Sequence, residues 1–286
     1  MIDVNLEGVE LFTYRNNDRA IAPLPSCVHE NCIEILVLHK GIQTITVEGD
    51  EFVVAGGDIV IIPAGYEHST GQHPQYSASY YRILLHRSEA APLLGLDSVY
   101  SRHLRAYLSS LQNYRYRSVV ALTELVASAY RHAILAAFPA QMQARGELIC
   151  FLTALENALC TQPTAKSPAI EAVFRYINDH ITEELSLQEL ADLSGCSLSY
   201  FKESFLKQVG ATPMYYINWR RIAHAKRMIA QGYSATETSM LLNFSSPTHF
   251  STVFKNYTAR TPMQYKALVD MELQKQRHLI DWVARI

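Results

Sequence analysis

The sequence has no long apolar run and no leader-like start. No stretch of about 18 uninterrupted apolar residues occurs in the 286 residues, and residues 1–30 hold no basic segment followed by an apolar core. The first absence argues against a transmembrane helix, and the second argues against a secretory signal. We therefore expect a cytoplasmic protein that does not associate with a membrane.

Cysteines are few and show no pairing pattern. The sequence holds five, and no two of them form a C-x-x-C pair: Cys27, Cys32, Cys150, Cys160 and Cys196. An odd number of thiols fits a reducing compartment better than a disulfide framework. The cysteines by themselves do not indicate a structural zinc site.

A basic excess is missing as well. The formal net charge is −2, whereas a protein that neutralises phosphates usually presents a basic surface. Residues from Ala169 to the end hold 13 Lys and Arg against 11 Asp and Glu, and the preceding 168 residues hold 12 against 16. Charge thus gives weak support for nucleic-acid binding by the C-terminal part, and a DNA argument must rest on sequence pattern.

Short runs that alternate apolar and polar residues occupy residues 5 to about 87. The segment Gly41–Asp50 indicates a strand that approaches a hairpin turn at Gly49-Asp50, and Ile59–Ile62 is closed by Pro63-Ala-Gly65. Many short strands with Gly and Pro turns are typical of a β-sandwich or a small barrel.

Apolar residues recur at helical spacing from about Pro92 to Cys160, as in Leu104, Leu108 and Leu111. The segment Thr161–Pro168 then loses periodicity and contains two prolines, which predicts a linker. A length of 286 residues is compatible with about two domains, so we place the start of a second domain near Ala169.

The C-terminal part contains an internal repeat. Shifting residues 187–216 by 49 positions places Phe201 on Phe250, Phe205 on Phe254 and Thr212-Pro-Met214 on Thr261-Pro-Met263. Agreement at a single offset indicates two copies of one supersecondary unit.

Each copy has the pattern of a helix, a tight turn and a second helix. In the first copy Ser186 and Glu189 have capping-box spacing, Ser194-Gly-Cys196 forms the turn, and Ser197 caps the next helix. In the second copy Ser234–Leu242 is the supporting helix and Ser246–Tyr257 is the exposed one.

A predicted helix over Met214–Gln231 joins the two copies, with Thr212-Pro213 at its start and Gly232 at its end. Two exposed helices held in this way can enter successive major-groove segments of one DNA duplex, roughly 34 Å apart. Pattern alone leaves a second interpretation open, because paired helical hairpins also occur in helical domains that bind no DNA.

The run Asn243–Tyr257, followed by Thr261-Pro262 and Tyr265, resembles the signature of the AraC/XylS family of transcription regulators. The first copy, from Leu187 through Thr212-Pro213, resembles its counterpart in the same family. The resemblance covers residues 170–266 and implies a sequence-specific DNA-binding regulator.

The resemblance and the outward helix faces together imply a set of base-reading positions. These are Ser199, Lys202 and Glu203 in the first copy and Thr248, His249, Ser251 and Thr252 in the second. Lys202 can donate to guanine and Glu203 can accept from cytosine, whereas short hydroxyls discriminate weakly between bases. We therefore expect the first helix to contribute more specificity than the second.

Two positions depart from the family pattern. Asn243 replaces a glycine that the family usually has in the turn, and Thr252 replaces a common arginine. Asparagine tolerates the left-handed backbone conformation, so we expect the turn to persist. The loss of the arginine predicts weaker binding by the second copy.

Four basic residues are candidate phosphate contacts, with a solvated side chain as the alternative for each. They are Lys207, Arg220, Arg221 and Lys255.

The N-terminal segment resembles the two cupin motifs. His29 and Glu34 are followed by Gly41 at H-x4-E-x6-G spacing, and His68 ends the pattern G-x5-P-x-G-x2-H. Regulators of this family often carry a cupin-like sensor at this place, which implies that a small molecule, such as a sugar or a related metabolite, binds there. Tyr66 offers a flat face for such a ligand, although tyrosines in strands more often pack.

The candidate effector-binding residues are Cys27, His29, Glu34, Tyr66 and His68. In metal-binding cupins a histidine stands where this chain has Cys27. Cys27, His29, Glu34 and His68 could still bind a borderline divalent ion. They could equally line an effector pocket without metal, which we favour, or only fill the barrel. We thus expect no metal and no cofactor.

The expected fold class is α+β, with an N-terminal cupin-like β-barrel domain and following helices, and a C-terminal all-α domain with two helix-turn-helix motifs. The segments are a sensing domain (1–90), a helical dimerisation or relay segment (91–160), a linker (161–168), the DNA-binding domain (169–267) and an extra C-terminal helix (268–286). For the helical segment, packing within the domain is the alternative to pairing.

The function expected from the sequence is effector-controlled, sequence-specific DNA binding without enzymatic activity. Expected partners are double-stranded DNA, a small-molecule effector and a second copy of the chain, with RNA polymerase as a further candidate. Two alternatives remain open: a metal-dependent cupin enzyme fused to a DNA-binding domain, or a regulator with a non-sensing N-terminal domain that is controlled by abundance or a partner.

Overall fold

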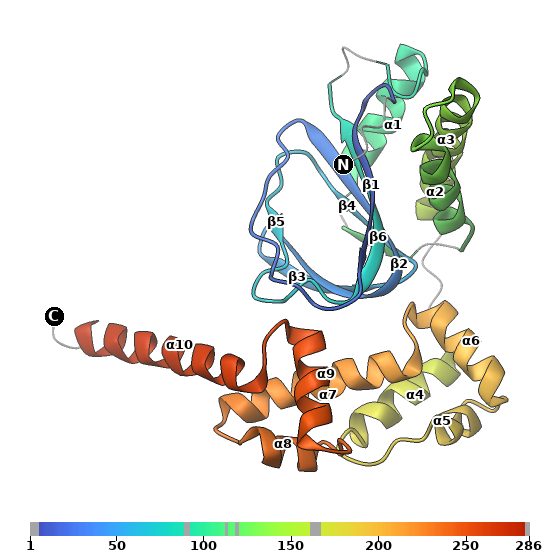
Figure 1. Cartoon of the computed structure of the whole chain (residues 1–286). Helices are drawn as coiled ribbons and strands as arrows, with labels where there is room; N and C mark the ends of the chain where they lie inside the picture. Colours follow the sequence, from blue (N-terminus) through green and yellow to red (C-terminus); the bar gives the residue numbers. More distant parts are fainter. Residues whose placement is uncertain (1–5, 89–91, 112–113, 118–119, 161–166, 284–286) are drawn as a thin grey trace. The chain divides into compact units, whose positions relative to one another are not determined.

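The computed structural model describes residues 6–88, 92–111, 114–117, 120–160 and 167–283 (Figure 1). The chain forms two compact units, one built mainly from residues before 161 and the other mainly from residues after 166. Most of the predicted linker, residues 161–166, lies outside the described residues. Its last two residues, Ser167 and Pro168, form the N-cap and first position of a helix.

The N-terminal unit is an antiparallel sheet in which one long strand holds the others together. The strand order is β1-β6-β2-β4-β7, and β3 and β5 also pair with β2. The strands are β1 (Val9–Asn17), β2 (Cys32–Val47), β3 (Asp50–Ala55), β4 (Asp58–Ile62), β5 (His68–Ser69), β6 (Ala78–His86) and β7 (Arg115–Arg117). The first half of β2 pairs with β4 and β6, and its second half pairs with β3 and β5.

The hairpin between β2 and β3 differs by one residue from the prediction. Val47 pairs with Asp50, so the loop consists of Glu48 and Gly49 rather than Gly49 and Asp50. Both loop residues have positive φ, 51° and 89°, as a two-residue type I′ hairpin requires. The alternation alone did not reveal that Asp50 still belongs to the ladder.

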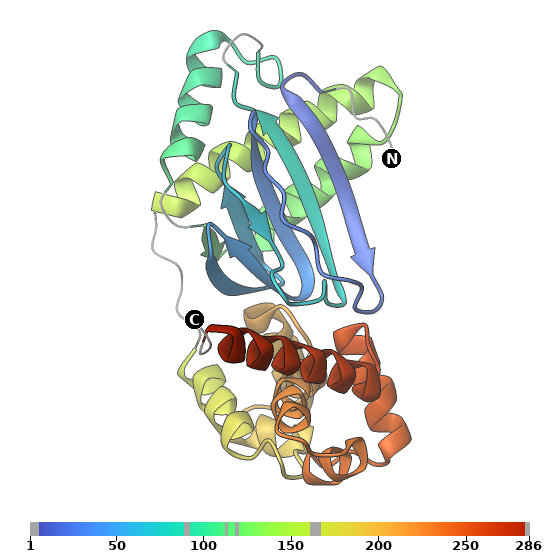
Figure 2. The same cartoon turned by 90° about the vertical axis from the view of Figure 1, so that its left-hand side faces the viewer.

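The main core lies between one face of the sheet and three helices, α1 (Ser98–Ser110), α2 (Val120–Ala133) and α3 (Phe138–Cys160), which cover that face (Figure 2). Ile33, Ile35 and Val37 alternate along β2 and point into this core, and Leu104 joins it from α1. The apolar stripes predicted for residues 91–160 are therefore buried within the unit. This is the arrangement expected if the helices pack within their own domain, the alternative to pairing with a second chain. The short strand β7, also in this segment, was not anticipated from the helical pattern.

The opposite face of the sheet carries a smaller apolar cluster that includes Leu38, Val60 and Ile62. Since side chains alternate along a strand, the residues of β2 between Ile33, Ile35 and Val37 point to this second face. Glu34 is one of them, and this face therefore carries the polar residues that the sequence singled out.

The C-terminal unit is entirely helical, and its local capping signals are those read from the sequence. Its helices are α4 (Pro168–Asp179), α5 (Leu187–Leu193), α6 (Leu198–Val209), α7 (Pro213–Ala230), α8 (Ala235–Leu241), α9 (Pro247–Thr258) and α10 (Pro262–Val283). Ser186 and Glu189 form a capping box, and Thr212 caps α7 with Pro213 at its first position.

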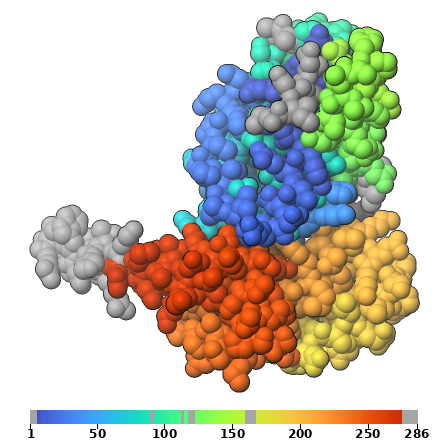
Figure 3. All heavy atoms as spheres, in the orientation of Figure 1, coloured from blue at the N-terminus to red at the C-terminus, as the bar shows by residue number. Residues whose placement is uncertain are grey.

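Of the predicted extra helix at residues 268–286, residues 268–283 are the continuation of α10, not a separate element, and residues 284–286 lie outside the described residues. In Figure 1 α10 runs away from the other helices of its unit, and Met271 and Leu273 on it are exposed. Figure 3 shows the described start of this helix in red at the edge of the unit. Leu268 and Val269 at the start of this segment are half-buried, and the described side chains from Asp270 to Gln274 are exposed. Among the helices that the structure describes, none combines the length and apolar character needed to cross a membrane.

Candidate functional site

Two helix pairs, α5–α6 and α8–α9, form the two predicted helix-turn-helix units. A residue with left-handed backbone stands in each turn: Gly195 has φ 70° and Asn243 has φ 53°. Asparagine is among the few side chains that adopt this conformation at small cost. The expectation that the turn persists with Asn243 is therefore confirmed.

The outward face of α6 presents the three residues expected to read bases in the first unit. Ser199, Lys202 and Glu203 are exposed, whereas Phe201 and Phe205 on the opposite side are 1% and 0% exposed. The buried phenylalanines determine the orientation of the helix, so the polar face is available to a partner.

The outward face of α9 presents Thr248, His249 and Thr252, with Ser251 partly exposed. Part of their hydrogen-bonding capacity is used within the unit. Thr252 Oγ1 donates to the Thr248 carbonyl at 3.0 Å, and His249 Nδ1 lies 3.0 Å from Ser245 Oγ. A hydroxyl bonded to its own helix is less available to a base edge, which agrees with the expectation of weaker readout by this helix.

The candidate phosphate contacts fall into different environments. Lys207 and Lys255 are exposed near the C-terminal ends of α6 and α9. Arg220 is half-buried, with its guanidinium 5.8 Å from the centre of the Trp219 ring. Lys207 and Lys255 therefore remain the more accessible candidates.

Arg221 is not accessible to a phosphate, and that prediction is corrected. Its side chain is 8% exposed, and it donates to the carbonyls of Ile181 at 3.2 Å, Glu183 at 2.6 Å and Asn243 at 3.5 Å. Burial also lowers its pKa. Arg221 on α7 thus connects the segment that precedes α5 with the turn after α8.

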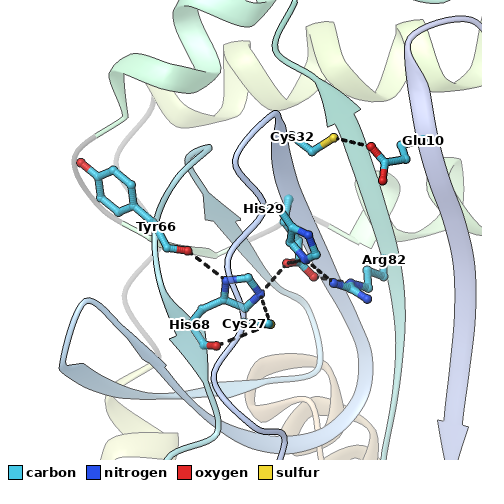
Figure 4. Close-up of polar contacts among 8 residues, drawn as sticks. Glu10, Cys27, His29, Cys32, Tyr66, His68 and Arg82 are labelled. Atoms are coloured by element: carbon cyan, nitrogen blue, oxygen red, sulfur yellow. Dashed lines mark hydrogen bonds and ion pairs between the residues drawn. The ribbon is translucent and has the colours of Figure 1, made fainter.

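In the N-terminal unit a polar cluster forms on the sheet face opposite the helices (Figure 4). Glu34 Oε2 lies 2.8 Å from His68 Nε2, and Cys27 Sγ lies 3.1 Å from the same nitrogen. His29 Nε2 is 3.5 Å from Glu34 Oε2. The structure therefore brings together Cys27, His29, Glu34 and His68, which the sequence singled out from positions up to 41 residues apart.

Arg82 on β6 completes the cluster, and the sequence analysis missed it. Its Nε donates to Glu34 Oε1, and its Nη2 donates to His29 Nε2 at 2.7 Å. The available signal was a single charge inside the apolar strand segment Tyr80–Leu85. The pairing of β6 with β2, which brings Arg82 beside Glu34, could not be read from either strand alone.

The electrostatics of the cluster centre on the buried carboxylate of Glu34, which is 2% exposed. Burial by itself would raise the pKa of Glu34, but its contacts with His68 and Arg82 outweigh burial and lower it. Burial likewise would lower the pKa of His68, but Glu34 outweighs it and raises that pKa. Burial lowers the pKa of His29, which favours the neutral ring that accepts from Arg82.

Two family models match the chain. An AraC-like ligand-binding domain matches residues 25–149, and a helix-turn-helix domain matches residues 190–267. Together they span more than two thirds of the chain, and each covers one of the sites described above. This chain belongs to the AraC family of DNA-binding transcription regulators.

This AraC-family chain is similar to known regulators over most of its length. It is 23% identical to the HTH-type transcriptional activator RhaS of Enterobacter sp. (strain 638), covering 94% of this chain and 99% of that protein. It is 22% identical to the uncharacterized regulator YisR of Bacillus subtilis (strain 168), covering 84% and 88%. An apo ToxT variant from Vibrio cholerae is 14% identical, with a TM-score of 0.35, and covers 90% of this chain and 97% of that one.

Three side chains of the polar cluster in this AraC-family ligand-binding domain have the spacing of metal ligands, but Arg82 lies among them. Cys27, His29 and His68 place one ligand atom each within 4.8 Å of one another. However, the Arg82 guanidinium repels a second cation and already contacts two of the atoms that would bind it, His29 Nε2 and Glu34 Oε1.

Tyr66 contributes to the cluster through its main chain only. Its carbonyl accepts from His68 Nδ1 at 3.2 Å, and Figure 4 shows its ring pointing away from the other residues. The ring packs instead near Tyr114, with the two ring centres 6.1 Å apart. The prediction that the Tyr66 ring offers a flat face to a ligand is therefore not supported.

An apolar cavity of about 370 Å³ lies elsewhere in the same domain, between α1 and α3. Leu96, Leu104 and Ile149 line it, and His103 Nε2 lies 2.8 Å from Glu156 Oε1 among the lining residues. This cavity offers few polar groups to orient a ligand, in contrast to the cluster around Glu34.

Proposed function

We propose that this regulator responds to a small polar effector, such as a sugar or a related metabolite, which binds at the cluster of Cys27, His29, Glu34, His68 and Arg82. The observation that carries the proposal is the convergence of these five side chains on one sheet face of a domain that the AraC-like ligand-binding model matches.

The cluster offers both donors and acceptors to such a molecule. Glu34 Oε2 is buried and, although it lies 2.8 Å from His68 Nε2, that contact lacks the alignment of a hydrogen bond. A buried acceptor without an aligned donor is costly, so a ligand hydroxyl that donates to it gains binding free energy. The Arg82 guanidinium can donate to the oxygens of the same ligand.

Effector binding acts on DNA binding by shifting an existing equilibrium between conformations. A ligand changes that equilibrium only by the difference between its affinities for the two states. The expected outcome is a change in the affinity of the regulator for its DNA when the effector is present.

The DNA-contacting residues remain proposals of the same kind. We expect Ser199, Lys202 and Glu203 on α6 to read bases, with Lys202 bonding guanine. The residues of α9, Thr248, His249, Ser251 and Thr252, position the second helix more than they discriminate. Lys207, Lys255 and Arg220 are the proposed phosphate contacts.

The effector proposal is tested by a thermal-shift screen of the full-length protein against monosaccharides, sugar acids and related polar metabolites. A ligand at 100 times its Kd raises the unfolding free energy by about 2.7 kcal/mol. Glu34→Gln and His29→Ala should abolish the shift. The matched control His103→Ala, in the cavity between α1 and α3, should preserve it.

Loss of the shift in His103→Ala but not in Glu34→Gln would place the effector in that cavity instead. If no compound stabilises the protein while DNA binding is intact, the domain does not sense a small molecule of this class. The regulator would then depend on its abundance or on a partner.

We further propose that the protein has no catalytic activity, since its relatives are transcription regulators and Arg82 contacts two of the groups that would bind a metal. Stoichiometric iron or manganese bound at this cluster, lost on replacing His29 and His68, would favour the cupin-enzyme alternative.

A homodimer is the proposed assembly, checked by light scattering of the full chain. RNA polymerase remains a candidate partner.

A further inference from the structure

Three side chains of kinds that bind metal ions lie close together at a second place on the sheet, outside the polar cluster around Glu34. Glu10, His86 and Cys32 come from β1, β6 and β2, which are neighbours in the sheet. Cys32 and His86 are direct partners in the pairing of β2 with β6. The sequence analysis did not select any of the three as a ligand.

A β-bulge places Glu10 in this group. On β1, Val9 is opposite Leu85 and Leu11 is opposite Leu84, so Glu10 is the extra residue between two successive positions of β6. A bulge re-aims a side chain and is common next to functional sites. Here it directs the carboxylate toward Cys32, as Figure 4 shows.

The distances between the ligand atoms are close to those around a tetrahedral ion. Cys32 Sγ lies 2.9 Å from Glu10 Oε2 and 3.7 Å from His86 Nδ1, and His86 Nδ1 lies 3.7 Å from Glu10 Oε2. Tetrahedral Zn²⁺ with ordinary bond lengths places such atoms about 3.4–3.6 Å apart. Small side-chain movements would therefore complete the geometry.

The backbone of His86 is held on both sides. Its amide donates to the Gly8 carbonyl at 2.9 Å, and its carbonyl accepts from Arg105 Nε at 2.8 Å. A ligand on a fixed backbone loses less conformational freedom when it binds an ion.

The charge environment distinguishes this group from the cluster around Glu34. Arg82 influences the pKa values of both Cys27 and His29. Burial and Glu10 raise the pKa of Cys32 to about 12, and Arg105 approaches this group through the main-chain carbonyl of His86, to which its Nε donates.

We propose that Glu10, Cys32 and His86 bind a borderline divalent cation of the Zn²⁺ class, with water in the fourth position. Carboxylate, imidazole and thiolate are all ligands of Zn²⁺, and three protein ligands plus water are a common open arrangement. Glu10 and His86 are 52% and 41% exposed, so the ion can enter from solvent. Cys32 releases its thiol proton to solvent when the ion binds. The site is independent of the effector proposal.

The experiment is a titration of the metal-free, full-length protein with Co²⁺, whose bond to a thiolate produces a charge-transfer absorption. One equivalent should produce this band, and Zn²⁺ should displace the Co²⁺ and abolish it. Cys32→Ala should lose the band. The matched controls Cys27→Ala, in the other cluster, and Cys150→Ala, at an exposed position, should retain it.

Cys32 is buried, so its replacement can disturb the fold as well as the site. A second pair of variants therefore separates loss of the site from misfolding. Glu10→Gln and His86→Gln change exposed side chains and should keep the circular-dichroism spectrum of the parent. Changes outside the immediate ligands lower metal affinity about 10–100-fold, so loss of a ligand should cost at least about 10-fold. The inference is overturned if the parent protein gives no band, if the band survives in Cys32→Ala, or if it depends on Cys27.

Discussion

The two helix-turn-helix units have closely similar frameworks and different outer faces. In both, a serine and a glutamate form a capping box, Ser186 with Glu189 and Ser234 with Glu237. In both, phenylalanines 49 residues apart are buried. The outward residues differ: Lys202 and Glu203 on α6 carry charges, whereas the corresponding Ser251 and Thr252 on α9 are small hydroxyl residues.

The residues that the two units share are those that folding requires, and the residues that differ are those that face a DNA partner. Caps and core phenylalanines are constrained because each unit must form its hairpin and bury its apolar side. The outward positions contribute little to folding and are free to differ. The predictions below test this division, from the largest expected effect to the smallest.

The frameworks should respond alike to loss of their core. Phe201→Ala and Phe250→Ala each remove a side chain that is at most 1% exposed, and each should lower the free energy of unfolding by about 3–5 kcal/mol. Urea unfolding followed by circular dichroism measures both. The exposed neighbours supply the controls, Tyr200→Ala and His249→Ala, which should change stability little. If only one of the two phenylalanines matters, the frameworks are not equivalent.

Arg221 joins the two units, so its removal should destabilise them together. Arg221→Ala leaves the carbonyls of Ile181, Glu183 and Asn243 without their charged donor, and we expect a loss of about 2–4 kcal/mol. Arg227→Ala, an exposed change on the same helix, should have almost no effect. Equal stability of both variants in urea unfolding would show that this connection contributes nothing.

The outer faces should respond differently. Lys202→Ala should weaken binding to specific DNA by about 1–3 kcal/mol, whereas Ser251→Ala, its counterpart on α9, should cost under about 1 kcal/mol. Fluorescence anisotropy with selected and random duplexes measures both losses. Lys207→Ala is the comparison for a phosphate contact and should weaken binding to every sequence alike. A uniform loss for Lys202→Ala would remove its role as a base reader.

The caps should contribute small and equal amounts. Ser186→Ala and Ser234→Ala each remove the side chain that accepts from the third helical amide, and each should cost about 1 kcal/mol of stability. Thermal unfolding of the two variants beside the parent checks this. A clear inequality would mean that one supporting helix depends on its cap and the other is held by packing.

Much of the framework could be predicted because its signals are local. The capping boxes, the proline at the start of α7 and the left-handed Asn243 depend on residues a few positions apart. The cupin-like spacings likewise selected Cys27, His29, Glu34 and His68, which the structure brings together. These predictions needed only residue order and elementary preferences.

The errors and omissions come from contacts between distant segments. Arg82 becomes part of the polar cluster only through the pairing of β6 with β2. Glu10 reaches Cys32 only through a bulge, and Arg221 is buried only because the segment before α5 and the turn after α8 close around it. The sequence near these residues does not name their partners: the single charge of Arg82 in an apolar strand marks the position as unusual but does not identify Glu34.

The central claim, that the first unit specifies DNA sequence while the second mainly positions the protein, is tested most directly by in vitro selection of DNA by the full-length chain. The account predicts two enriched segments about one helical turn apart, with stronger base preference in one, and loss of preference at one position of that segment in Lys202→Ala. Selection with no enriched sequence, or an unchanged profile for Lys202→Ala alongside an altered one for Ser251→Ala, would contradict it.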